Sequence, residues 1–343
     1  MLKYFGWAYG VTVVGLALAF WVGWAYTSTL SGALGFLMIG AILAVLEISL
    51  SFDNAIVNAN KLDKMTPVWR HRFLTWGIVI AVFGMRILFP LLVVVVAAHI
   101  NPVEAIRLAA TQPARYAEII NDAHLSIAAF GGAFLMMVSL SWFVDAEKEI
   151  DWIKGLEKAM RKCGAFRGIE IAIVLLLVLI FSMILPDAET GTFLFAAVFG
   201  IVTFLAVEIL GHVLDSSATT GQVARGGLGA FLYLEVLDAS FSFDGVIGAF
   251  ALTQNLFLIA IGLGIGAMYV RSMTIMLVER KTLAEFRYLE HGAFWSILIL
   301  SLIMFAQTLF HVPEVITGLL GAGFIGLSLM SSLRHNRQCR AAE

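Results

Sequence analysis

Long apolar segments fill most of the chain and leave room only for short polar connections. A helix needs about 20 mostly apolar residues to cross a bilayer. Ten segments approach or exceed that length: 5–26, 34–57, 73–98, 125–144, 169–185, 192–214, 228–252, 256–278, 294–309 and 315–333. Charged residues make up only 13% of the chain, against about 25% in soluble domains. The sequence therefore predicts an all-α polytopic membrane protein with about ten transmembrane helices.

The positive charges predict how these helices are oriented. If the first helix starts in the cytoplasm and ten helices cross the membrane, all but four of the 22 lysines and arginines fall in cytoplasmic segments. The exceptions are Arg86 and Arg271, inside predicted helices, and Arg107 and Arg115, in an outer segment. Because Lys and Arg accumulate in cytoplasmic loops, we expect both termini in the cytoplasm and the chain in a bacterial inner membrane.

Two remaining features limit the partners. Lysines and arginines are scattered over short loops, which excludes a basic surface for nucleic acids. The two cysteines, Cys163 and Cys339, are too few for a thiolate metal site and fall in predicted cytoplasmic segments. The lipid bilayer is an expected partner, and the oligomeric state is left undetermined by the sequence.

The predicted cytoplasmic segment 145–167 carries apolar residues at helical spacing. Ile150, Ile153, Leu156 and Met160 alternate there with lysines. This pattern is typical of a helix that lies on the inner membrane surface. A solvated loop with one or two helical turns explains it equally well.

One acidic motif occurs twice. Residues 47–60 read EISLSFDNAIVNAN and residues 238–251 read DASFSFDGVIGAFA, at an offset of 191 residues (238 − 47). The offset aligns four polar pairs: Glu47 with Asp238, Ser49 with Ser240, Ser51 with Ser242, and Asp53 with Asp244. Carboxylates inside apolar segments are costly and usually mark a functional site. Matching motifs in two halves are typical of transporters built from repeats.

The predicted topology makes the two motifs antiparallel. Their helices, 34–57 and 228–252, cross the membrane in opposite directions, as in inverted repeats whose site lies near the midplane. We therefore expect five regions: an N-terminal transmembrane helix 1–30, a first repeat 31–145, an amphipathic loop with two linking helices 146–226, a second repeat 227–311, and a last helix with a basic tail 312–343.

Helix geometry predicts that the motif helices are broken. On a regular helix, Glu47 and Asp53 would lie about 120° apart in projection and about 9 Å apart along the axis. Unwinding at 49–51 would bring them together and expose backbone carbonyls. Ser49 and Ser240 each precede an aspartate by four residues, so their hydroxyls could orient the carboxylates.

The converging groups predict the kind of ion. The expected ligands are carboxylates and one amide: Glu47, Asp53, Asp238, Asp244 and Asn54. Oxygen ligands favour a hard divalent cation such as Mn²⁺, Mg²⁺ or Ca²⁺. Arg86 and Arg271 would balance the excess negative charge. Loss of the ion would favour protonation of carboxylates held close together, which predicts proton exchange.

Several alternatives remain open at this point. The acids could form only structural salt bridges with Arg86 and Arg271. Glu235, one turn before Asp238, either supports the site or bonds to a neighbouring group. Glu208 and His212 have a spacing used by metal ligands, although a core or capping histidine explains a single pair as well. Residues 262–267, GLGIGA, predict close helix packing. A phosphate-binding loop is not expected there, because no strand precedes these residues.

The motifs resemble those of a known family. Residues 47–55 (EISLSFDNA) are similar to the first signature of TerC-type integral membrane proteins, and residues 235–244 (EVLDASFSFD) to the second. The family commonly has Ser where this chain has Gly245. The resemblance covers the second to fourth and seventh to ninth predicted helices, which suggests a divergent branch of the LysE-related transporter superfamily.

The resemblance implies an activity and a set of ligands. TerC relatives export manganese, and the positions matching their motifs become ion ligands: Glu47, Asp53, Asn54, Asp238, Asp244 and, less directly, Glu235. The first hypothesis is thus an Mn²⁺ exporter, or an exporter of another cation such as Ca²⁺, without enzymatic activity or an organic cofactor. A second is a TerC-type accessory factor for metalation or insertion of exported proteins. An intramembrane aspartyl protease is a third, which explains neither the repeated serines nor the arginines.

Overall fold

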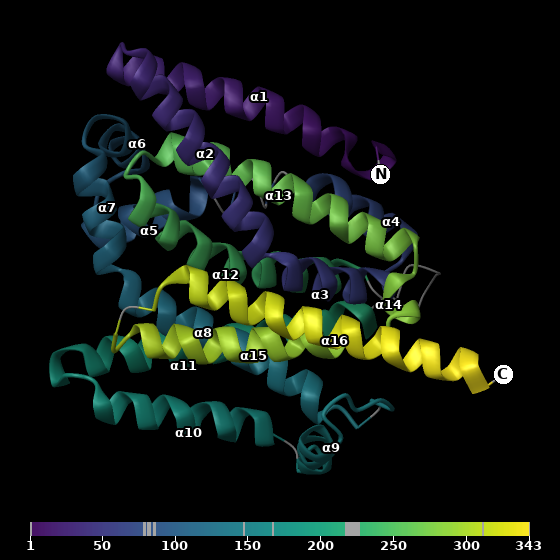
Figure 1. The fold of residues 1–343 in the computed structure, drawn as a ribbon. Helices are drawn as coiled ribbons and strands as arrows, with labels where there is room; N and C mark the ends of the chain where they lie inside the picture. Colours follow the sequence, from purple (N-terminus) through teal and green to yellow (C-terminus); the bar gives the residue numbers. More distant parts are fainter. Residues whose placement is uncertain are drawn as a thin grey trace. The chain divides into compact units, whose positions relative to one another are not determined.

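The chain folds into α-helices and one π-helical turn, with no strand among the residues described. The structure is a computed structural model that describes residues 2–77, 80, 84, 87–146, 148–166, 168–216, 227–310 and 312–342. In chain order the elements are α1 (Leu2–Thr27), α2 (Leu30–Leu50), α3 (Phe52–Asp63), α4 (Pro67–Arg72), the π-helix η1 (Phe73–Gly77), α5 (Phe89–Ala98), α6 (Pro102–Thr111), α7 (Pro113–Asp122), α8 (His124–Val144), α9 (Lys154–Cys163), α10 (Ile169–Ile184), α11 (Asp187–Ser216), α12 (Leu228–Leu252), α13 (Leu256–Glu279), α14 (Thr282–Glu285), α15 (Leu289–Gln307) and α16 (Glu314–Ala342) (Figure 1).

The predicted membrane helices are recovered in part. Among the described residues, seven helices are long and apolar enough to cross a membrane: α1, α2, α8, α11, α13, α15 and α16. The apolar helix α10 is shorter. The predicted segment 228–252 coincides with α12. The predicted segment 73–98 contains η1 and α5, and seven residues between them lie outside the described part of the chain. An all-α membrane protein is therefore confirmed, and the full count of ten spans stays a prediction.

The chain divides into two compact units that do not follow chain order. Unit 1 comprises Met1–Ala55, Pro67–His124 and Leu234–Met276. Unit 2 comprises Ile56–Thr66, Leu125–Tyr233 and Leu277–Glu343. Residues 47–55 of the first motif and the whole second motif belong to unit 1.

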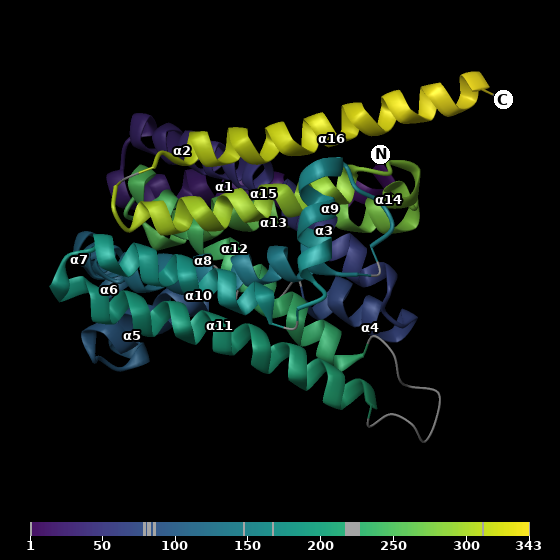
Figure 2. The same cartoon turned by 90° about the horizontal axis from the view of Figure 1, so that it is seen from below.

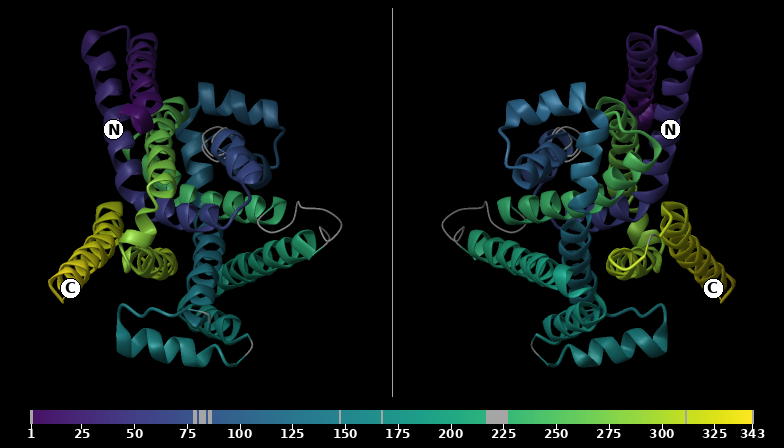
Figure 3. Two further views of the ribbon diagram at one scale, coloured as in Figure 1. Left: turned by 90° about the vertical axis from the view of Figure 1, so that its right-hand side faces the viewer. Right: turned by 90° about the vertical axis from the view of Figure 1, so that its left-hand side faces the viewer.

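Close packing of α2 against α13 organises one side of unit 1. A Cβ atom at Gly262 would lie only 2.5 Å from the Cβ of Leu43, and one at Gly266 would overlap the Cβ and Cγ of Glu47. The glycines therefore let the two backbones approach each other, as small residues do in membrane helices. The close packing predicted for 262–267 is confirmed, and Figure 3 shows α1, α2 and α13 as neighbours.

A helical hairpin closes another part of unit 1. Helix α6 begins at Pro102 after Asn101, whose side chain accepts a 2.8 Å hydrogen bond from the backbone of Glu104. On α7, Tyr116 is fully buried and its ring lies 6.0 Å from that of Phe250, and this burial raises the pKa of Tyr116. The hairpin is thus anchored to α12 by its apolar side.

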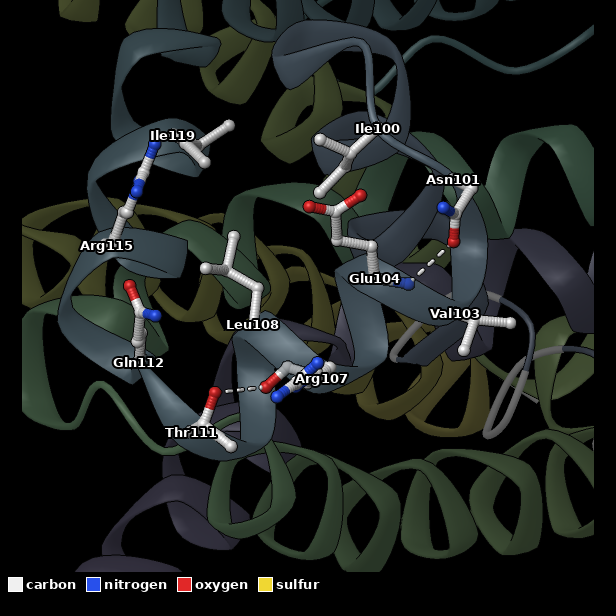
Figure 4. Close-up of a pocket in the computed structure, with 10 residues that line it drawn as sticks. All are labelled: Ile100, Asn101, Val103, Glu104, Arg107, Leu108, Thr111, Gln112, Arg115 and Ile119. Atoms are coloured by element: carbon white, nitrogen blue, oxygen red, sulfur yellow. Dashed lines mark hydrogen bonds between the residues drawn. The ribbon is translucent and has the colours of Figure 1, made fainter.

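The opposite side of the hairpin forms an open pocket of about 750 Å³. Figure 4 shows Glu104 of α6 and Arg115 of α7 on different sides of this pocket. Both side chains are exposed. The segment that contains Arg107 and Arg115 therefore consists of two short helices with a solvent-accessible groove.

Unit 2 is built around α8, most of whose side chains are buried. Helices α15 and α16 pack side by side (Figure 2). Gly132 of α8 faces the ring of Phe305 on α15, where a Cβ atom would lie 2.9 Å from the ring. Small residues again allow apolar helices to pack closely.

Candidate metal site

The first motif contains a break at Ser51. Helix α2 ends at Leu50 and α3 begins at Phe52, and Ser51 between them has φ −101° and ψ 18°. The backbone N–H of Ser51 still bonds to the Glu47 carbonyl at 3.0 Å, and that of Ala55 bonds to the Ser51 carbonyl at 3.2 Å. The break expected at 49–51 is thus confirmed as a one-residue kink, without an extended unwound segment.

The second motif contains no break. Helix α12 continues through it from Leu228 to Leu252, so the prediction that both motif helices are broken is wrong for this one. In apolar surroundings an unbroken helix satisfies its own backbone groups. The hydroxyl of Ser240 also bonds within this helix, donating to the carbonyl of Val236 at 3.0 Å.

Glu47 links the two motifs. It is buried, with only 2% of its surface exposed, and its Oε1 accepts a 3.0 Å hydrogen bond from the Ser51 hydroxyl. Its Oε2 lies 3.0 Å from the position that a Cβ atom would occupy at Gly245. Because Gly245 has no side chain, the carboxylate reaches the backbone of α12 inside the second motif.

Asp53 and Asn54 lie in the first turn of α3 and are both buried. Asp53 Oδ1 accepts a 2.8 Å hydrogen bond from the backbone N–H of Asn54, and a carboxylate is favoured at this helix end by the helix dipole. The amide oxygen of Asn54 is buried without a hydrogen-bond partner in the described part of the chain. Buried polar atoms are normally satisfied, so this oxygen is available to a ligand.

Two acids of α12, Glu235 and Asp238, are also buried, and one of them lacks a hydrogen-bond partner in the described part of the chain. Glu235 is 6% exposed, and neither of its carboxylate oxygens has a hydrogen-bond partner among the described residues. A Cβ atom at Gly77 would lie 2.8 Å from Glu235 Oε1, so the carboxylate touches the backbone of η1. Asp238 is buried one turn further along. The side chain of Asp244 lies outside the described residues.

Ser49 and Ser240 each donate a hydrogen bond to their own helix. Ser49 is exposed and its hydroxyl donates to the Val45 carbonyl at 2.8 Å. Ser240 bonds to its own helix in the same way. The serine that contacts an acid is Ser51, four residues after Glu47. The same i,i+4 spacing that drew attention to Ser49 and Asp53 identifies this pair as well.

Arg271 binds a backbone carbonyl. Its Nε and Nη2 donate to the Leu74 oxygen at 3.0 and 2.6 Å. Leu74 belongs to the π-helical turn η1, and such turns often occur at functional sites. This contact positions η1, and the predicted pairing of Arg271 with carboxylates stays a prediction, because the side chain of Asp244 lies outside the described residues. Arg86 lies outside the described residues.

The described side chains do not form a complete metal cage. No group of three or more His, Cys, Asp or Glu side chains among them is arranged to hold a metal ion, and Asp244 is not included in that set. The described oxygens on α2, α3 and α12 are each buried, and the contact that joins two of these helices is that of the Glu47 carboxylate with Gly245. The weaker candidate Glu208 lines a separate pocket of about 420 Å³ in unit 2, and the side chain of His212 lies outside the described residues.

Comparison with known proteins assigns the chain to a family. No curated protein and no solved structure matches it. One family matches residues 52–339, a range that begins at the kink and includes Asp53 and the whole second motif. The chain therefore belongs to the family described as "Protein of unknown function (DUF475)".

Proposed function

We propose that this protein is a membrane transporter that exports a hard divalent cation, with Mn²⁺ as the first candidate. The observation that carries the proposal is the contact between the motifs: the carboxylate of Glu47 lies against the backbone of α12 at Gly245. Two acidic motifs far apart in the chain thus contribute to one buried region of unit 1. Structural salt bridges alone would not require this approach.

The available oxygens support a cation as the substrate. Asn54 Oδ1 and both oxygens of Glu235 are buried without hydrogen-bond partners in the described part of the chain. Leaving such atoms unpaired costs free energy, whereas coordination of an ion would satisfy them. Carboxylate and amide oxygens suit Mn²⁺, Mg²⁺ and Ca²⁺. The preference for Mn²⁺ comes from the resemblance to TerC-type proteins.

The proposed mechanism is alternating access between two inverted three-helix repeats, within residues 31–145 and 227–311. The kink at Ser51 offers a joint at which α3 can change its angle to α2. When the cation leaves, protons replace part of its charge on the carboxylates, since unpaired negative charges are unfavourable in apolar surroundings. Export would then be coupled to proton uptake from the opposite side.

The proposal is tested by reconstituting the purified chain into liposomes that contain a fluorescent dye. Mn²⁺ quenches the fluorescence of this dye when it enters the liposomes. We expect quenching that depends on the protein and responds to an imposed pH gradient. Asp53→Asn should abolish it, and Ser51→Ala should slow it by loosening Glu47. Ser49→Ala is the matched control, because this exposed serine bonds only to its own helix.

The results separate the hypotheses. Equal flux through wild-type and Asp53→Asn protein would contradict transport through this site. Flux that ignores the pH gradient would contradict proton coupling alone. A third result would instead favour the accessory factor that delivers metal to other proteins. In that case wild-type protein binds Mn²⁺ without any flux in liposomes, and Asp53→Asn abolishes the binding.

A further inference from the structure

Helix α9 crosses the end of the helix bundle in unit 2. Figure 1 views α9 along its axis while α10, α15 and α16 run across the picture. Figure 2, turned by 90°, shows α9 running across the direction of α15 and α16. Since α15 and α16 are long and apolar enough to span a membrane, a helix that crosses them lies along the membrane plane.

A fully buried carboxylate fixes α9 in this position. Glu157 has no exposed surface. Its carboxylate is bound by the Lys148 ammonium (2.9 Å), His291 Nδ1 (2.7 Å), Trp295 Nε1 (2.9 Å) and the backbone N–H groups of Trp152 (3.2 Å) and Ile153 (3.3 Å). Buried charges are retained in proteins when they are paired and hydrogen-bonded in this way. The side of α9 that carries Glu157 therefore faces the protein.

The partners of Glu157 define the depth of α9. His291 and Trp295 lie in the first two turns of α15, which is itself a candidate membrane span. Helix α9 thus lies level with the end of a spanning helix. Trp142 and Trp152 occur at the same end, next to Lys148 and α9. Tryptophan is enriched at the boundary between hydrocarbon and water.

An apolar stripe of α9 is left uncovered. Leu156 of α9 is 49% exposed, Ile153 just before the helix is 39% exposed, and Phe166 just after it is 70% exposed. Cys163 follows Leu156 after seven residues, which is two helical turns, and is also exposed. Apolar side chains exposed in a row are unfavourable in water and favourable at a lipid surface.

The lysines of α9 lie on a different side of the helix. Lys154, Lys158 and Lys162 recur every four residues and are all exposed. Their spacing places them on the side opposite Leu156 and Cys163. An apolar stripe flanked by a lysine-rich face is typical of helices that bind anionic membrane surfaces.

We propose that α9 and Phe166 form an interfacial docking surface for anionic lipid, with Ile153, Leu156 and Phe166 inserted among the headgroups and the three lysines attracting their charge. The bilayer is the occupant because α9 is held level with the end of α15 and parallel to the membrane plane. The Glu157 cluster keeps the stripe turned outward, so the docking surface exists before lipid binds. This inference does not depend on the proposed transport activity.

A spin label at Cys163 tests the orientation. The Cys339→Ser variant of the full chain leaves Cys163 as its one cysteine, and the labelled protein is placed in nanodiscs of phosphatidylcholine with phosphatidylglycerol. We expect the label to collide more often with oxygen, which enters lipid, than with a water-soluble nickel chelate. The matched control carries Gly155→Cys with Cys163→Ser and Cys339→Ser, because Gly155 is exposed and faces open space. Its label should favour the nickel chelate severalfold.

The charge component has a separate readout. In nanodiscs of phosphatidylcholine alone, the Cys163 label should shift toward water, and the combined variant Lys154→Gln, Lys158→Gln, Lys162→Gln should lose its response to phosphatidylglycerol. Equal nickel accessibility at Cys163 and at the Gly155→Cys position would overturn the docking proposal. A full response to phosphatidylglycerol in the triple lysine variant would overturn the role of the lysines.

Discussion

Replacement of Glu157 by alanine tests whether its buried carboxylate holds α9 in place. The substitution removes the common acceptor of Lys148 and His291 and leaves the Lys148 ammonium without its ion pair. Removing one member of a buried ion pair costs about 3–5 kcal/mol. That range is expected here because Glu157 has no exposed surface through which water could replace the lost contacts.

Hydrogen–deuterium exchange measures this loss where it occurs. Local opening of α9 must break the Glu157 contacts, so its free energy should fall by the same amount in the Glu157→Ala variant. A loss of about 3–5 kcal/mol corresponds to exchange about a hundredfold to a few thousandfold faster for the α9 amides. Amides in α13, which belongs to unit 1, should keep their rates.

The control variant is Glu149→Ala. Glu149 precedes α9 in the same segment and is exposed, so its loss should change the local free energy by no more than about 0.5 kcal/mol. If the α9 amides exchange at the same rates in Glu157→Ala and Glu149→Ala, the Glu157 carboxylate does not stabilise α9, and the inference that it holds the helix in place is refuted.

Three further outcomes are expected. Burial alone would raise the pKa of Glu157, but hydrogen bonds from His291 and other donors lower the pKa well below its ordinary value of 4.5. The stabilisation of α9 by Glu157 should therefore be complete above about pH 4.5 and decline as the pH falls. Exchange rates of the α9 amides, corrected for intrinsic exchange, will measure this decline. Gly266→Ala should destabilise the protein by about 1–3 kcal/mol in thermal unfolding, because the added methyl overlaps Glu47, whereas Gly35→Ala, which faces open space, should not. Asn54→Ala should weaken Mn²⁺ binding in equilibrium dialysis with little change in thermal stability, since its amide oxygen has no partner in the described chain; unchanged binding would remove Asn54 from the ligand set.

The interpretation of Gly245 differs between the sequence and the structure. In the sequence it is a missing hydroxyl ligand, because TerC-type motifs commonly carry Ser there. In the structure its missing side chain makes room for the carboxylate of Glu47. The glycine therefore lets a carboxylate of the other motif approach α12, and it also removes a hydroxyl from its own motif.

Local sequence patterns determined the helical part of this protein. Apolar runs identified α12 with its observed ends, and the small residues at 262–267 identified close packing. The acidic and serine-rich stretch after Glu47 also located the kink at Ser51. Each of these properties depends on residues within a few turns of one another, so spacing and composition are sufficient to predict it.

Only the tertiary structure decided which polar groups meet. Arg271 binds the carbonyl of Leu74, 197 residues away in sequence, and Glu157 binds His291, 134 residues away. Periodicity marked the apolar residues of α9 as a stripe, but it could not show that a glutamate occupies the side facing the protein. A buried charge is stable only where several distant donors converge on it, and that convergence is a property of the packed helices.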